Sequence, residues 1–147
     1  MGHVITIRPA VPADAAALAA LAGQFGYPTT DEEARRRLTL LARLPDDVVW
    51  VAETPGHEVI GWLHASRTVT LVADVAVEVR GLVVDEGHRS QGVGARLMEA
   101  AEAWARTFGA RSVNLRSNVL RGEAHRFYER LGYEEIKRQA TFRRDLP

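Results

Sequence analysis

The stretch HRSQGVGARLMEA, residues 88–100, constrains the fold most, because it joins an apolar run to an amphipathic segment through two closely spaced glycines. Residues 75–84 are mostly apolar and predict a strand, in which a glycine at position 81 indicates a bulge or a close backbone approach. Apolar residues at helical spacing then predict a helix that closes near Gly109. A helix that starts at such a turn presents unpaired N–H groups and a partial positive charge. We therefore expect an anion, and a phosphate above all, to bind there.

The other patterns complete a mixed α/β domain that spans residues 1–147 in the order β-α-α-β-β-β-α-β-α-β. Further strands are expected at 4–8, 48–53, 59–65 and 112–117 and within 134–143, and further helices at 14–21, from the capping box that begins at Thr30 to Pro45, and at 123–131. Residues 54–57 predict a hairpin turn, and Gly132 predicts a left-handed helix cap. No repeat or linker divides the chain.

Composition excludes several classes of protein. Lys plus Arg and Asp plus Glu both number 19, and this balance argues against a general nucleic-acid binder. The chain has no cysteine, which excludes thiolate zinc sites and a cysteine nucleophile. It has neither an apolar run of membrane-spanning length nor a secretory signal pattern, so we expect a cytoplasmic protein without a membrane partner.

The glycine turn matches neither of two common phosphate motifs. A Walker loop needs Lys and Ser or Thr after its last glycine, whereas Ala95 and Arg96 follow Gly94 here. A dinucleotide fingerprint needs a third glycine where this chain has Leu97. Taken alone, the Gly-Val-Gly turn fits an anion site and an ordinary tight turn equally well.

Three separated segments resemble the GCN5-related N-acetyltransferases, the GNAT superfamily. RGLVVDEGHRSQGVGARLMEAAEAWA is similar to the family's core, whose R/Q-x-x-G-x-G/A signature here reads from Arg89 to Gly94. IRPAVPADAAAL resembles the family's opening, and RGEAHRFYERLGYEE resembles its closing segment. The resemblance implies one N-acetyltransferase domain with a mostly antiparallel mixed sheet. It also implies that this sheet splays at the cofactor strand and that about four helices flank it.

The resemblance implies acetyl-coenzyme A as co-substrate, without a metal. The pantetheine arm is expected on the backbone of Leu82, Val83 and Val84. The same residues also fit an ordinary buried strand, because their side chains can pack while the backbone binds a ligand. The pyrophosphate is expected on the N–H groups of residues 90–95, namely Ser90, Gln91, Gly92, Val93, Gly94 and Ala95, with the cations Arg89 and Arg96 beside it. The acceptor would be a primary amine of a small molecule, an amino acid or a peptide or protein. The alternative is a domain that senses coenzyme A without transferring an acetyl group.

Direct transfer to an amine needs a donor for the carbonyl oxygen, a base for the amine and a proton for the leaving sulfur. By resemblance, the N–H of Leu82 is the oxygen donor and Tyr128 the proton donor. Tyr128 also fits a packing role beside Phe127. Glu78 is the candidate base, although an ion pair near Arg80 or a solvated position would suit it too.

One departure from the family concerns a residue that contacts the cofactor. Many relatives have asparagine seven positions before the tyrosine, where this chain has Arg121, and Asn118 lies ten positions before it. Both residues are therefore candidates for contact with coenzyme A. His125 fits either a proton shuttle or packing. Candidate residues for the acceptor pocket are Tyr27, Trp50, Trp62 and His64, although the strand settings of Trp50 and Trp62 favour positions in the core. A homodimer is an assembly that the family often forms.

Overall fold

The computed structural model describes residues 4–117 and 122–147, which group into two compact units, one ending at Leu115 and one beginning at Arg116. In the first unit the elements are β1 (Thr6–Pro9), the short 3-10 helix η1 (Pro12–Asp14), α1 (Ala15–Gln24), α2 (Asp31–Leu41), β2 (Asp47–Glu53), β3 (Val59–Thr70), β4 (Ala73–Val84), the short 3-10 helix η2 (Glu86–His88), α3 (Val93–Thr107) and β5 (Val113–Leu115). The second unit contains α4 (Gly122–Arg130). Asn118 and Arg121 lie outside the described residues.

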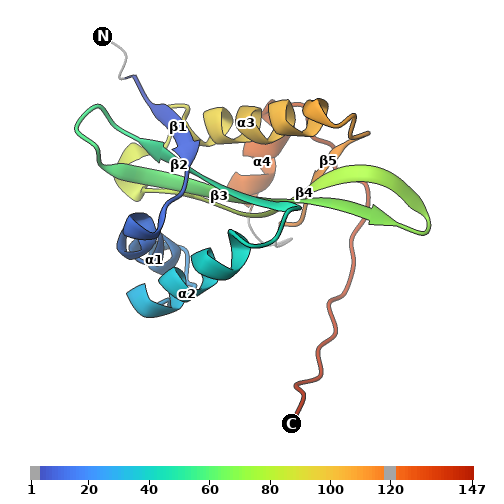
Figure 1. The fold of residues 1–147 in the computed structure, drawn as a ribbon. Coiled ribbons are helices and arrows are strands. Elements are labelled where there is room, and N and C mark those ends of the chain that lie inside the picture. The colour runs from blue at the N-terminus through green and yellow to red at the C-terminus, as the bar shows by residue number, and fades with distance from the viewer. Residues whose placement is uncertain (1–3, 118–121) are drawn as a thin grey trace. The chain divides into compact units, whose positions relative to one another are not determined.

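The described strands form one five-stranded sheet in the order β1-β2-β3-β4-β5. Neighbouring strands are antiparallel except β4 and β5, which are parallel. Helix α3 covers one face of the sheet, and α1 and α2 lie over the other face (Figure 1). The expected mixed, mostly antiparallel sheet with four helices is confirmed.

The packing of α3 on the sheet depends on a glycine. A Cβ at Gly61 would lie 3.3 Å from side-chain atoms of both Val93 and Leu97, so the missing side chain lets α3 approach β3 closely. On the same face the Trp50 and Trp104 rings meet edge to face with their centroids 5.8 Å apart. Trp50 therefore packs against α3 and does not line a pocket on the α1/α2 face.

A bulge interrupts the pairing of β3 and β4. Gly81 pairs with His64 and Val79 pairs with Ala65, so Arg80 is the extra residue. The predicted irregularity at Gly81 is confirmed, and so is the close approach. A Cβ at this position would lie 2.9 Å from the Trp62 ring.

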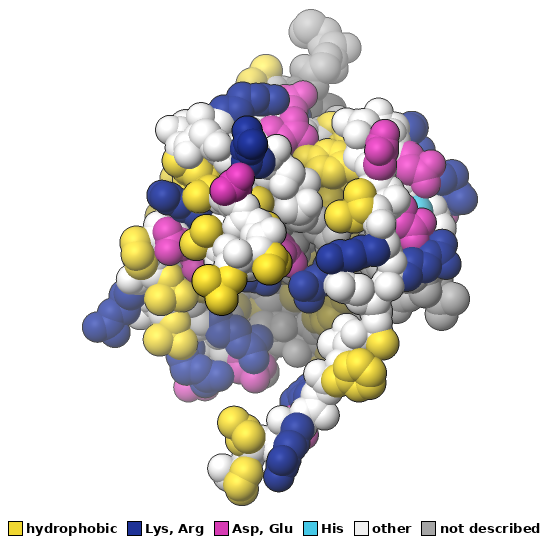
Figure 2. Space-filling view, turned by 90° about the vertical axis from the view of Figure 1, so that its right-hand side faces the viewer, with side chains coloured by type: hydrophobic (Ala, Val, Ile, Leu, Met, Phe, Trp, Pro, Cys, Tyr) yellow, Lys and Arg dark blue, Asp and Glu magenta, His cyan; other side chains and the backbone are white. Residues whose placement is uncertain are grey.

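The strand expected within 134–143 is wrong, because no residue from 133 to 147 is in a strand. Its charged side chains pair locally, Arg138 with Glu135 and Arg143 with Asp145, instead of across a ladder. Ile136 is 75% exposed, so little apolar burial is available to offset the cost of ordering a strand. Figure 2 shows hydrophobic and basic side chains interspersed on the surface of this segment.

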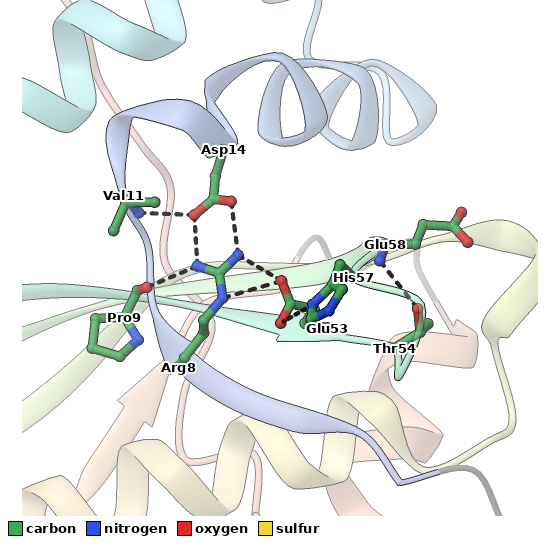
Figure 3. Close-up of polar contacts among 8 residues, drawn as sticks. All are labelled: Arg8, Pro9, Val11, Asp14, Glu53, Thr54, His57 and Glu58. Carbon is green, nitrogen blue, oxygen red and sulfur yellow. Dashed lines mark hydrogen bonds and ion pairs between the residues drawn. The ribbon is translucent and has the colours of Figure 1, made fainter.

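An arginine between two carboxylates ties the start of the chain to the sheet (Figure 3). The Arg8 guanidinium donates to both carboxylate oxygens of Asp14 at 2.9 Å and to Glu53 at 2.9 Å. Asp14 also accepts from the Val11 N–H at 2.8 Å. The hydrogen bonds from Arg8 hold the pKa of both carboxyl groups below the usual range. This network joins β1, η1 and β2 at one point.

We expect Arg8→Met to lower the free energy of unfolding by about 3 kcal/mol, because it leaves the Asp14 carboxylate buried without its cation. The matched control is Arg37→Met, which breaks an exposed pair with Glu33 on α2 and should cost less than about 0.5 kcal/mol. Urea denaturation measures both. Equal effects of the two substitutions would contradict the structural role of Arg8.

The same network predicts how stability depends on pH. The folded pKa of Asp14 lies below its unfolded value, so its contribution is complete above the unfolded pKa, ~3.9. That contribution is lost as the pH falls through the lower, folded pKa. Wild type should therefore lose stability below about pH 4 more steeply than Arg8→Met. Parallel stability–pH curves would contradict the linkage.

A further test concerns the contact between Gly81 and Trp62. Gly81→Ala should cost about 1–3 kcal/mol, because the added methyl group collides with the indole ring. Gly23→Ala, in α1 with open space around its Cβ, should instead stabilise by about 0.5–1 kcal/mol. Both values come from urea denaturation. The close approach would be refuted if Gly81→Ala were as stable as wild type.

Candidate active site

The turn before α3 leaves the first N–H groups of the helix available. Gly92 is the N-cap residue, has a φ of 79°, and provides no side-chain cap. Ser90 also has a positive φ, 66°, which is unusual for a residue with a side chain. Gly94 lies inside the first helical turn and does not share the positive φ of Gly92. The result is an exposed, uncapped helix N-terminus of the kind that binds anions.

A side-chain amide from α1 fixes the loop that leads into this turn. The Gln24 amide donates to Asp85 at 2.8 Å and accepts from the Glu86 N–H at 3.0 Å. Asp85 also contacts His88 Nδ1 at 2.8 Å. The hydrogen bonds from Gln24 and His88 hold the pKa of Asp85 below its usual range. Sequence reasoning missed Gln24, because its partners lie about sixty residues away and no local motif marks it.

The expected phosphate ligands differ in how the loop holds them. The Arg89 guanidinium lies over the Phe25 ring, 4.9 Å from its centroid, so α1 also positions this cation. Ser90, Gln91 and Arg96 are exposed. Val93 is buried in the core, so only its backbone can face a ligand.

Strand β4 has an open edge beyond the point where β5 ends. Asp85 donates its N–H to a β3 carbonyl at 2.8 Å, and N–H groups alternate between the two edges of a strand. The N–H of Val83 therefore faces β3, whereas those of Leu82 and Val84 face the opposite edge. On that edge β5 pairs only with residues 77–79, and no other described strand continues the pairing. The backbone at Leu82 and Val84 is thus arranged to pair with an extended ligand.

A chain of polar side chains crosses the sheet on the α1/α2 face, next to the bulge. His64 Nε2 lies 2.7 Å from Asp47 Oδ1, and the Ser66 hydroxyl donates to the same oxygen. Arg80 Nε donates to Ser66 Oγ at 3.2 Å. Glu78 is the register partner of Ser66 and lies 3.7 Å from Arg80 Nη1. The candidate base therefore belongs to a network of which the sequence analysis named Glu78, Arg80 and His64 separately, but not Asp47 or Ser66.

The charge of Asp47 is set by this network. Burial would raise the pKa of Asp47, but hydrogen bonds from Ser66 and His64, with the positive charge of Arg80, outweigh it and lower the pKa. Asp47 is therefore a carboxylate at neutral pH. Nothing in the local sequence marked it, because its partners are 17 and 19 residues away on the next strand.

In the second unit, Tyr128 lies on α4 between two aromatic rings. Its centroid is 5.1 Å from that of Phe127 and 6.2 Å from that of Tyr133, so the packing role considered for Tyr128 is present. Burial raises the pKa of Tyr128 above its usual value, so the phenol keeps its proton at neutral pH. Gly132 has the left-handed backbone expected of a helix cap, with a φ of 93°.

None of the described helices combines the length and the apolar character that crossing a bilayer requires. Within the same residues, no three His, Asp or Glu side chains gather as a metal site would need.

Known proteins match the chain in both sequence and fold. Residues 45–135 match the family described as the acetyltransferase (GNAT) domain. The aminoglycoside N(6')-acetyltransferase type 1 of Stenotrophomonas maltophilia is 32% identical over 146 residues, which cover 96% of this chain and 94% of that protein. The aminoalkylphosphonate N-acetyltransferase of Salmonella typhimurium is 43% identical over 58 residues, covering 40% of this chain and 38% of that protein.

Among solved structures, the aminoglycoside N-acetyltransferase AAC(6')-Iy in complex with CoA has a TM-score of 0.85. The match covers 99% of this chain and 98% of that one at 20% identity, so it shows a shared fold. The family match spans more than half of the chain, and the Stenotrophomonas relative is similar over almost all of it. The chain belongs to the GNAT family of N-acetyltransferases.

Proposed function

We propose that the chain transfers the acetyl group of acetyl-coenzyme A directly to a primary amine of a small molecule, with residues 1–147 acting as one domain. The observation that carries this proposal is the uncapped start of α3 beside the open edge of β4. The first feature suits a pyrophosphate and the second an extended pantetheine arm. The CoA complex of AAC(6')-Iy, which has the same fold, supports this assignment.

The residues divide the chemistry among them. The N–H of Leu82, on the open edge, would donate to the thioester oxygen as negative charge develops there. The Tyr128 phenol, which keeps its proton because burial raises its pKa, would protonate the leaving sulfur. Glu78 and its neighbours on the α1/α2 face would meet the amine. The thioester is already activated, so transfer needs no nucleophilic side chain.

Amino sugars are the acceptor class that the comparison supports, because the Stenotrophomonas protein is named for aminoglycosides. The carboxylates Asp47 and Glu78 suit a cationic acceptor, because they place negative charge on one face of the sheet. The direct test is thiol release from acetyl-coenzyme A with a panel of amino sugars, aminoalkylphosphonates, polyamines and amino acids. Coenzyme A binding without thiol release from any amine would refute transfer and support a sensor.

Gly92→Asp tests the phosphate site. The new carboxylate would stand at the helix N-terminus, where it repels a phosphate, so CoA affinity should fall at least about 100-fold, or about 2.7 kcal/mol. Gly109→Asp is a matched control, because Gly109 also has a positive φ, 70°, and open space around its Cβ. Isothermal titration with CoA measures both. Normal affinity in Gly92→Asp would place the pyrophosphate elsewhere.

Tyr128→Phe tests the proton donor. Turnover should fall about 100-fold while the Kd for acetyl-coenzyme A changes less than about twofold, because only the phenolic proton is lost. Tyr133→Phe, which alters the neighbouring ring in the same way, should keep most of the activity. If Tyr128→Phe retains wild-type turnover, Tyr128 serves packing alone.

A further inference from the structure

The pair formed by Asp47 and His64 is held in a geometry that leaves one imidazole nitrogen able to take a proton. Asp47 is ionised and can only accept, so the hydrogen bond of 2.7 Å requires the proton on His64 Nε2. In the neutral ring, Nδ1 then carries the lone pair. None of the described residues donates a hydrogen bond to Nδ1, and the His64 side chain remains 20% exposed.

Ser66 and Arg80 keep this arrangement in place. The Ser66 hydroxyl donates to the same Asp47 oxygen and accepts from Arg80 at 3.2 Å, so its orientation is determined at both ends. Ser66 is 5% exposed, which shields that side of the carboxylate from water. A fixed carboxylate behind a histidine stabilises the imidazolium once a proton arrives.

The register places His64 at the bulge. His64 pairs with Gly81, the residue before Leu82, and directly opposite residues in antiparallel strands lie about 4.5–5.5 Å apart at Cα. Glu78 pairs with Ser66, farther from the bulge than His64, and it is in ion-pair distance of Arg80. Of these two groups on one face, His64 is therefore nearer to the Leu82 N–H.

We propose that His64, oriented by Asp47, is the catalytic base that takes the proton from the ammonium group of the acceptor, directly or through one water. This inference rests on the proposed function and names a residue that the function does not by itself require. The acceptor binds as an ammonium ion and becomes a nucleophile only after this proton leaves.

The proton balance is complete without a further reactant. One ammonium proton passes to His64 Nδ1 and later to solvent. The neutral nitrogen then forms a bond to the acetyl carbon, and the bond from that carbon to sulfur breaks. Tyr128 gives its proton to the leaving thiolate and is reprotonated by the second proton of the nitrogen. The products are the amide, coenzyme A with a free thiol, and the imidazolium of His64, which then releases its proton to solvent.

The charged strand residues around His64 lie on the two strands that flank β3. Asp47 is on β2, and Glu78 and Arg80 are on β4. Helix α1, which packs against β3, contains no titratable side chain. Helix α2, which packs against β2, carries Asp31, Glu32, Glu33, Arg35, Arg36 and Arg37, all of them exposed except the half-buried Glu33. The titratable groups of α3 lie on the opposite face of the sheet. A pH effect that disappears in His64→Gln and weakens in Asp47→Asn is therefore attributable to this pair.

The experiment measures kcat/KM against pH for wild type and His64→Gln, using amines of different pKa that the enzyme accepts. In wild type the fall of kcat/KM at low pH should reflect protonation of an enzyme group, so its midpoint should stay fixed as the amine changes. In His64→Gln the rate at pH 7 should fall about 100-fold, and the limb should follow the pKa of each amine. Asp47→Asn should lower the rate less and shift the limb.

His57→Gln is the matched control, because His57 also lies beside a carboxylate, 3.6 Å from Glu53, on an exposed turn. It should keep the wild-type profile. Added imidazole should partly restore the rate of His64→Ala, and CoA titration should show that the variants still bind the co-substrate. An unchanged profile in His64→Gln, with wild-type turnover intact, overturns the role of His64 alone. Failure of wild type to release thiol with any amine overturns the proposed function itself.

Discussion

The bulge in β4 is the constraint on which the site depends. Arg80 is the extra residue there, and from Gly81 onward β4 continues beside β3 while β5 has already ended. The N–H groups of Leu82 and Val84 then face an edge that lacks a described strand partner. Unpaired backbone groups are costly when buried, so such an edge is stable only where water or a ligand can pair with it. Because β5 ends early, this sheet keeps an edge at Leu82 and Val84 that an extended ligand can pair with.

The loop that would hold the cofactor is anchored to the helix on the acceptor side. Gln24 bonds both Asp85 and the Glu86 backbone, and Phe25 supports Arg89. Both anchors come from the end of α1. The end of α1 therefore fixes the loop that leads into the turn at Gly92.

Local chemistry explains which features the sequence could predict. The roles of Gly81 and Gly92 were predictable from the sequence. A glycine inside a strand usually marks a bulge or a close approach, and a glycine just before a helix usually marks a turn. Asp47 and Gln24 were not, because their roles come from partners brought near by folding, on another strand and on a distant loop. The strand expected within 134–143 is wrong because its charged side chains pair locally and its apolar side chains stay exposed, and an alternating pattern alone does not reveal either outcome. The catalytic roles of Tyr128, Glu78 and Leu82 remain predictions.

In the proposed site, the backbone edge of β4 would bind the co-substrate, and side chains on the α1/α2 face of the sheet would carry out the chemistry. The backbone of Leu82 and Val84 would pair with the co-substrate, and that contact is almost independent of the side chains. The side chains of Glu78, Ser66 and His64 share the α1/α2 face, where the acceptor would arrive. Substitutions on that face can alter which amine is bound and how it loses its proton while the backbone edge is kept. A family with this division can diversify its acceptors without rebuilding its cofactor site, which fits one fold serving many amines.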